Sequence, residues 1–100
     1  MKNSGSDGVK HDDGKPMWSL LPWEQMESVV KILTFGAKKY KADNWRIVAD
    51  GEKRYLNAAL RHICAIQKGE SDDGETGQSH YAHAICSLLF AFWHNSGKKS

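Results

Sequence analysis

The sequence has few of the features that mark secreted, redox-active or membrane proteins. It contains only two cysteines, Cys64 and Cys86, and they lack the C-x-x-C spacing of a zinc or redox site. No stretch reaches the ~18 apolar residues of a membrane span, and the N-terminus has no apolar segment typical of a signal peptide. We therefore interpret both cysteines as buried free thiols in a reducing cytosol, and we predict no membrane partner.

The chain also lacks a large charge of one sign. Its formal net charge is +2, which is too small to indicate nucleic acid, so we predict no specific nucleic-acid partner. The composition is 40% hydrophobic and 26% charged, as in ordinary globular proteins. One hundred residues make one domain. Such a short chain buries only about two-thirds of its unfolded surface, so a homo-oligomer is a plausible source of further core.

Strand patterns are absent, and apolar residues recur instead at helical spacing. Pro22 is placed like the first-turn proline of a helix, Gly69 like a stop, and Ser79 like the N-cap of a further helix. We predict an all-α fold of three main helices with a polar N-terminal loop. The predicted parts are a flexible segment (1–16), one helical domain (17–96) with helices near 22–40, 52–68 and 79–94, and a disordered tail (97–100).

The apolar positions predict which helix faces form the core. In the third helix we expect the large side chains to face inward, with small residues on the opposite side allowing another helix to approach closely. Three helices are too few to close a large core alone, so we expect a symmetric oligomer to complete a helical bundle. The residues expected in the core are Tyr55, Leu56, Ala59, Leu60, Ile63 and Ile66, then Tyr81, Ile85, Leu88, Leu89 and Phe92.

The segment between Arg61 and His83 contains several side chains that can bind metal or move protons. Such groups rarely lie next to a core unless they are paired or hold a metal. Neutral imidazole can ligate metal or act as a general base near neutral pH. A solvated acidic loop with merely packed histidines is the alternative. The predicted catalytic residues are His62, Glu70, Asp73, His80 and His83.

Carboxylates predict a second property, the binding of Mg²⁺ or Mn²⁺, which prefer oxygen ligands. Glu24 and Glu27 are spaced i, i+3 and project from one helix face, although acids in a first turn also simply favour the helix dipole. Further along, the loop acids repel one another unless a cation or basic groups lie among them. The predicted metal ligands are Glu24, Glu27, Glu70, Asp73 and Glu75.

Basic and aromatic residues predict a phosphate and nucleotide site. Lysine and arginine near a carboxylate-bound cation suit phosphate esters. Aromatic residues can stack on a base, although packing is their commoner role. The predicted nucleotide-binding residues are Lys10, His11, Asp12, Lys15, Lys38, Tyr40, Asn44, Trp45 and Arg61.

Three stretches together resemble a known family. They read KHDDGKPMWSLLP, LTFGAKKYKADNW and ALRHICAIQKGESDDGETGQSHYAHAICSLLF, and they lie between Lys10 and Phe90. The chain resembles the N-terminal domain of phage dATP/dGTP diphosphohydrolases, a family considered related to the all-α MazG-like nucleotide pyrophosphohydrolases. Those enzymes hold divalent metals with an E-x-x-E pair and a later E-x-x-D pair, and Glu24-x-x-Glu27 and Glu70-x-x-Asp73 match this wording. In MazG-like enzymes the second pair is helical, whereas Gly69 and Gly74 here predict a loop.

The resemblance implies metal-assisted hydrolysis of a purine deoxynucleoside triphosphate, dATP or dGTP, to a monophosphate and pyrophosphate. It implies Mg²⁺ or Mn²⁺ as cofactor and the cytoplasm of an infected bacterial host as the setting. Two alternatives stay open. One is a binding protein without turnover that sequesters a nucleotide of host defence signalling. The other is a structural helical oligomer.

Overall fold

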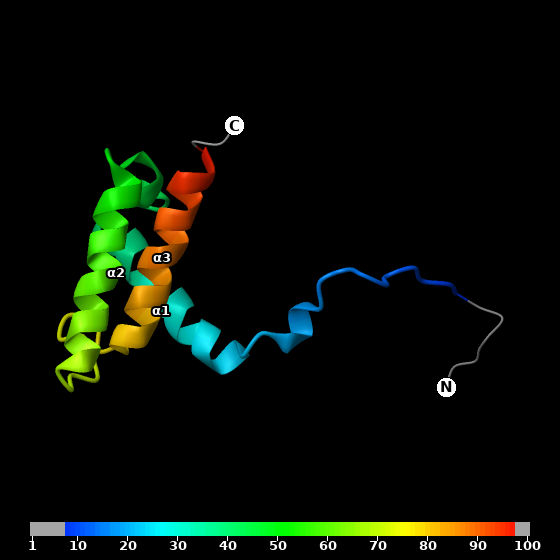
Figure 1. The fold of residues 1–100 in the computed structure, drawn as a ribbon, viewed down its shortest axis with the longest axis horizontal. Coiled ribbons are helices and arrows are strands. Elements are labelled where there is room, and N and C mark those ends of the chain that lie inside the picture. The colour runs from blue at the N-terminus through cyan, green and yellow to red at the C-terminus, as the bar shows by residue number, and fades with distance from the viewer. Residues whose placement is uncertain (1–7, 98–100) are drawn as a thin grey trace.

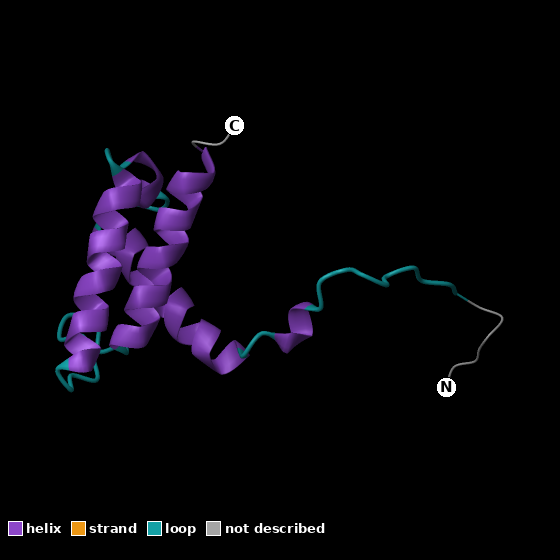
Figure 2. Ribbon diagram, viewed as in Figure 1, coloured by secondary structure: helices purple, strands orange, loops and turns teal. Residues whose placement is uncertain are grey.

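The computed structural model describes residues 8–97, and over that range the chain is helical with no strand, as predicted (Figure 2). The three main helices are α1 (Trp23–Lys39), α2 (Gly51–Gln67) and α3 (His80–Gly97). Two short 3-10 helices, η1 (Trp18–Leu20) and η2 (Asn44–Ile47), were not predicted. Most of the predicted tail and the first seven residues of the predicted flexible segment lie outside the described residues.

Helix boundaries follow the local signals closely. Pro22 precedes α1, and Ser79 caps α3 because its Oγ accepts a hydrogen bond of 3.0 Å from the backbone N–H of Tyr81. Gly36 does not end α1, which continues to Lys39. The third helix continues past the predicted end at His94 to Gly97. No helix among residues 8–97 is both long and apolar enough to cross a bilayer.

The helices pack around a small core. Helices α2 and α3 lie side by side and run in opposite directions, and α1 packs against α3 (Figure 1). Val29 and Ile32 of α1 meet Ala82 and Cys86 of α3 in the buried cluster. The segment before η1 runs away from the helices, which contributes to overall dimensions of 56 × 36 × 27 Å (Figure 1).

The face of α3 that we predicted as core is exposed, so that prediction is wrong. The helix buries its small residues, Ala82, Ala84, Cys86 and Ala91, because small side chains let neighbouring helices approach closely. Several large residues of α2 are exposed as well, and Cys64 is exposed rather than buried. The large side chains predicted as core but exposed are Leu56, Leu60, Ile63, Tyr81, Ile85, Leu88, Leu89 and Phe92.

The connection between α1 and α2 is held against the end of α3. Asp43 and Asp50 adopt left-handed backbone angles, with φ of 64° and 55°, which aspartate tolerates better than most residues. His94 donates a hydrogen bond of 2.9 Å from Nε2 to the carbonyl of Trp45. A Cβ at Gly51 would collide with the imidazole ring of His94, so any larger residue here would force that ring to move.

Candidate functional site

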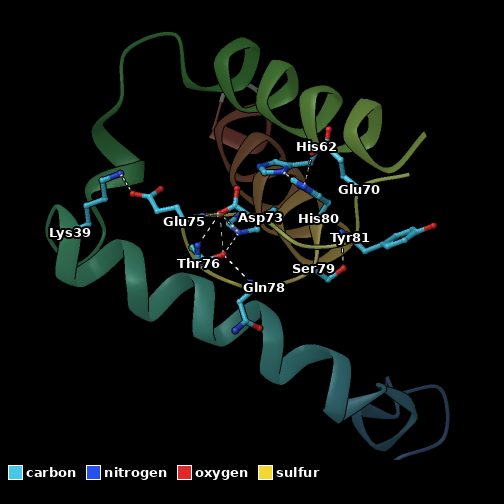
Figure 3. Close-up of polar contacts among 11 residues, drawn as sticks. Lys39, His62, Glu70, Asp73, Glu75, Thr76, Gln78, Ser79, His80 and Tyr81 are labelled. Carbon is cyan, nitrogen blue, oxygen red and sulfur yellow. Dashed lines mark hydrogen bonds and ion pairs between the residues drawn. The ribbon is translucent and has the colours of Figure 1, made fainter. Parts of the chain in front are cut away.

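The acidic segment between α2 and α3 is an ordered loop. The Oδ2 atom of Asp73 accepts hydrogen bonds from the backbone N–H groups of Glu75 and Thr76, both at 3.0 Å, and from the Thr76 hydroxyl at 3.3 Å. An isolated bridge between Asp72 and Ser79 brings the two sides of the loop together. The loop is therefore fixed by its own polar groups, with Asp73 at its centre (Figure 3).

Three histidines of α2 and α3 cluster next to this loop. His62 projects from α2, and His80 and His83 project from the first turn of α3. The Nδ1 atoms of His62 and His80 lie 2.9 Å apart, and the rings of His62 and His83 are stacked with centroids 4.6 Å apart. His83 Nε2 shares a hydrogen bond of 2.6 Å with the hydroxyl of Thr76. The structure thus brings together the residues that sequence analysis grouped, and adds Thr76.

The surroundings of the cluster favour neutral imidazoles at His62 and His83 and an ionised carboxylate at Asp73. Burial, followed by the neighbouring His83 and His80, lowers the pKa of His62. Burial also lowers the pKa of His83 and outweighs the opposing effect of Asp73. Burial raises the pKa of Asp73, but the hydrogen bonds from Thr76 and Glu75 and the charge of His83 hold it below its ordinary value. The imidazoles of His62 and His83 can therefore accept protons or ligate metal near neutral pH.

A cavity of about 800 Å³ adjoins the histidine cluster. It lies between the C-terminal half of α1, the α1–α2 connection, α2 and α3, and its size suits a small-molecule ligand. Of the five predicted catalytic residues, only His83 lines it, together with Thr76. The predicted nucleotide-binding residues that line it are Tyr40, Asn44, Trp45 and Arg61.

The cavity wall carries an excess of positive charge. Five basic side chains line it against two acidic ones, Asp43 and Glu75, which leaves three positive charges in excess. Both acids are already paired with cations of the wall. Asp43 lies 3.3 Å from Arg46, and Glu75 lies 2.7 Å from Lys39. The remaining cations, which form no ion pair among residues 8–97, are Lys41, Arg54 and Arg61.

Aromatic residues of the cavity have different roles. Trp45 stacks on Phe90 with ring centroids 4.4 Å apart, and the guanidinium of Arg46 lies 4.4 Å from its ring. Trp45 is therefore held by packing. Tyr40 is 65% exposed, so it is the more accessible aromatic residue for a base. Tyr55, which the apolar periodicity placed in the core, and Phe90, which no sequence signal singled out, also line the cavity.

The other predicted binding residues lie elsewhere. Lys10, His11, Asp12 and Lys15 belong to the segment that runs away from the helices (Figure 1), and Lys38 is exposed on α1 but does not line the cavity. Their predicted roles in binding phosphate stay predictions.

Over residues 8–97 the carboxylates do not form an oxygen-only metal site. Among residues 8–97, one group of three or more potential ligands converges, and it consists of His62, Asp73 and His80. Glu24 and Glu27 belong to no such group. The residues present therefore do not assemble the carboxylate set that the MazG resemblance implies, because two of the three converging ligands are imidazoles.

Comparisons with known proteins agree with the resemblance. The family described as dATP/dGTP diphosphohydrolase, N-terminal, matches residues 5–100. A dATP/dGTP diphosphohydrolase of Salmonella phage PMBT28 is 38% identical over 86 residues, which are 86% of this chain and 29% of that protein. The chain thus spans less than a third of the length of this relative. No solved structure matches.

Proposed function

Because the chain belongs to the family of dATP/dGTP diphosphohydrolase N-terminal domains, we propose that it acts on purine deoxynucleoside triphosphates. The reaction is metal-dependent hydrolysis of dATP or dGTP to a monophosphate and pyrophosphate, in the cytoplasm of an infected bacterial host. The observation that carries the proposal is the cavity of about 800 Å³, whose wall has three unpaired cations next to the His83–Thr76 pair. Excess positive charge suits a triphosphate, which is polyanionic.

The chain's own residues suggest how the reaction proceeds. Arg54 and Arg61 bind phosphate oxygens and offset the charge that develops on them. Water attacks the α-phosphorus and gives a proton to the Thr76 hydroxyl, whose own proton passes to His83 Nε2 over 2.6 Å. The new bond joins the water oxygen to the α-phosphorus, and the bond to the bridging oxygen breaks to release pyrophosphate. The converging ligands among residues 8–97 are not the carboxylate set that Mg²⁺ or Mn²⁺ prefers, so these steps use only side chains of the protein.

A second function is favoured by the same observation. A cavity with basic and aromatic residues, in a structure whose described part brings no oxygen-only ligand set together, also suits a protein that binds a nucleotide without cleaving it. Such a domain would sequester a signalling nucleotide of host defence. Its ligand would be recovered intact.

One experiment separates the two functions. The protein is incubated with a panel of nucleotides and Mg²⁺ or Mn²⁺, and the products are identified by mass spectrometry before and after denaturation. We expect conversion of dATP or dGTP to monophosphate and pyrophosphate, with His83→Gln slowing turnover while nucleotide affinity persists. Stoichiometric recovery of an intact nucleotide supports capture instead, and a panel that is neither cleaved nor bound contradicts both functions.

We also propose that a second copy of this chain covers the exposed apolar stripes of α2 and α3. Leu56, Leu60 and Ile63 recur at i, i+4, i+7, and exposed apolar stripes of this kind mark interaction surfaces. Light scattering after gel filtration should give a mass above one chain, and Leu60→Glu should reduce it. A monomeric wild-type protein would contradict the proposal. The stripe on α3 consists of Ile85, Leu88, Leu89 and Phe92.

A further inference from the structure

His62, Asp73 and His80 bring potential metal-ligand atoms close together in the folded chain. One potential ligand atom from each residue lies within 4.8 Å of the others. The three residues come from α2, the acidic loop and the first turn of α3 (Figure 3). Side chains from three separate segments meet at one point only when tertiary structure brings them there, so helical spacing alone does not account for the cluster.

The contact between the two imidazoles matches a shared ion. His62 Nδ1 and His80 Nδ1 face each other at 2.9 Å. Bonds from histidine to zinc are about 2.0–2.1 Å long, so two nitrogens of a tetrahedral site lie ~3.3 Å apart, and a shift of a few tenths of an ångström would let both imidazoles bind one ion. A hydrogen bond between the rings gives a similar distance, and the surroundings of the other nitrogen of His80 bear on the choice between the two arrangements.

The other ring nitrogen of His80, Nε2, gives separate support for a bound ion. His80 is 7% exposed, and its Nε2 is buried with no hydrogen-bond partner. It lies 3.5 Å from a carboxylate oxygen of Glu70, in a geometry that makes no hydrogen bond. Histidines that ligate a metal through one ring nitrogen usually direct the other N–H at a carboxylate or carbonyl. Ligation through Nδ1 would place Nε2–H toward Glu70 in this arrangement.

The carboxylate of Asp73 is also held in place by hydrogen bonds. Its Oδ2 accepts three hydrogen bonds within the loop, and its Oδ1 accepts none among residues 8–97. Ligating carboxylates are commonly held by such bonds, which orient the free oxygen. The set is thus two imidazole nitrogens and one carboxylate oxygen.

We propose that His62 Nδ1, His80 Nδ1 and Asp73 bind one first-row transition metal ion of the Zn²⁺ class, oriented by Glu70 and the acidic loop. Nitrogen ligands favour Zn²⁺, Co²⁺ or Ni²⁺ over Mg²⁺. The ion joins α2, the loop and α3, and it lies next to the cavity because His83, which lines it, stacks on His62. The proposal stands whether or not the domain hydrolyses a nucleotide, because its test measures bound metal.

The test uses the untagged chain, stripped of metal and then incubated separately with Zn²⁺, Co²⁺ and Mg²⁺. After gel filtration, elemental analysis should find about one equivalent of Zn²⁺ or Co²⁺ per chain and no retained Mg²⁺. Bound Co²⁺ should give a visible ligand-field absorption band. A wild-type protein that retains neither Zn²⁺ nor Co²⁺ overturns the proposal without any variant.

Variants locate the ion. His62→Asn and Asp73→Asn should each lower retained Co²⁺ at least tenfold, while His11→Asn, which removes an exposed histidine of the N-terminal segment, should retain the full equivalent. Circular dichroism confirms that each variant is folded. If both folded site variants keep the full equivalent, or if His11→Asn loses it, the ion is bound elsewhere and the assignment is wrong.

Discussion

Two acidic pairs of equal spacing have very different surroundings in this molecule. Glu24 and Glu27 lie at the start of α1, are exposed, and make no hydrogen bond or ion pair among residues 8–97. Glu70 and Asp73 lie in the loop before α3, where Asp73 accepts three hydrogen bonds and Glu70 approaches a buried histidine. Equal spacing therefore does not give equal surroundings, because the loop supplies hydrogen bonds to Asp73 and the packing of α3 brings His80 to Glu70.

The largest expected effect is a difference in alkylation rate between the two cysteines, whose surroundings also differ. Cys64 is exposed, whereas burial raises the pKa of Cys86 from 9.0 to about 11. The reactive thiolate of Cys86 is therefore about a hundredfold scarcer than for a thiol of ordinary pKa, before access is counted. Alkylation at pH 8, followed by peptide mass spectrometry, should modify Cys64 at least a hundredfold faster. In urea the two rates should converge, and equal rates in the folded protein would contradict the difference.

The next effect concerns stability. Asp73→Ala removes the acceptor of three hydrogen bonds, so we expect the free energy of unfolding to fall by about 2 kcal/mol. Glu27→Ala removes an exposed carboxylate with no partner and should change it by less than ~0.5 kcal/mol. Urea denaturation followed by circular dichroism measures both. Equal losses of unfolding free energy would mean that the hydrogen bonds to Asp73 do not stabilise the fold.

A smaller effect separates cations inside and outside the cavity. Arg61 lines the wall without an ion pair, so Arg61→Gln should weaken dGTP binding about tenfold, or ~1.4 kcal/mol. Lys38→Gln is the matched control, because Lys38 carries the same charge but does not line the cavity. Isothermal titration calorimetry of both variants gives the affinities. A greater loss for Lys38→Gln would place the phosphates outside the cavity.

Sequence analysis predicts the helices well because helix formation depends on local signals. The periodicity of apolar residues, Pro22 and the Ser79 cap place the starts of α1 and α3 within one residue. It fails on the buried face of α3, because the pattern shows two distinct faces but not which one a neighbouring helix covers. Large side chains such as Leu88 and Leu89 are exposed while alanines are buried.

Part of the candidate site was predictable because several of its residues lie close together in the sequence. His62, Asp73 and His80 are close enough in sequence to be grouped by inspection. The choice of Nδ1 by His62 and His80, the contribution of Thr76 and the separation of His83 into the cavity wall depend on how α2 and α3 pack. Left-handed angles at Asp43 and Asp50, which carry Trp45 to Phe90, also have no periodic signal.

Gly51 has a consequence for how this domain can vary. The absence of one methyl group lets His94 approach the start of α2 and hold the carbonyl of Trp45. Any larger residue at this position would displace His94 from the carbonyl of Trp45, which lines the cavity. The shape of the cavity is therefore sensitive to a residue that does not itself line it.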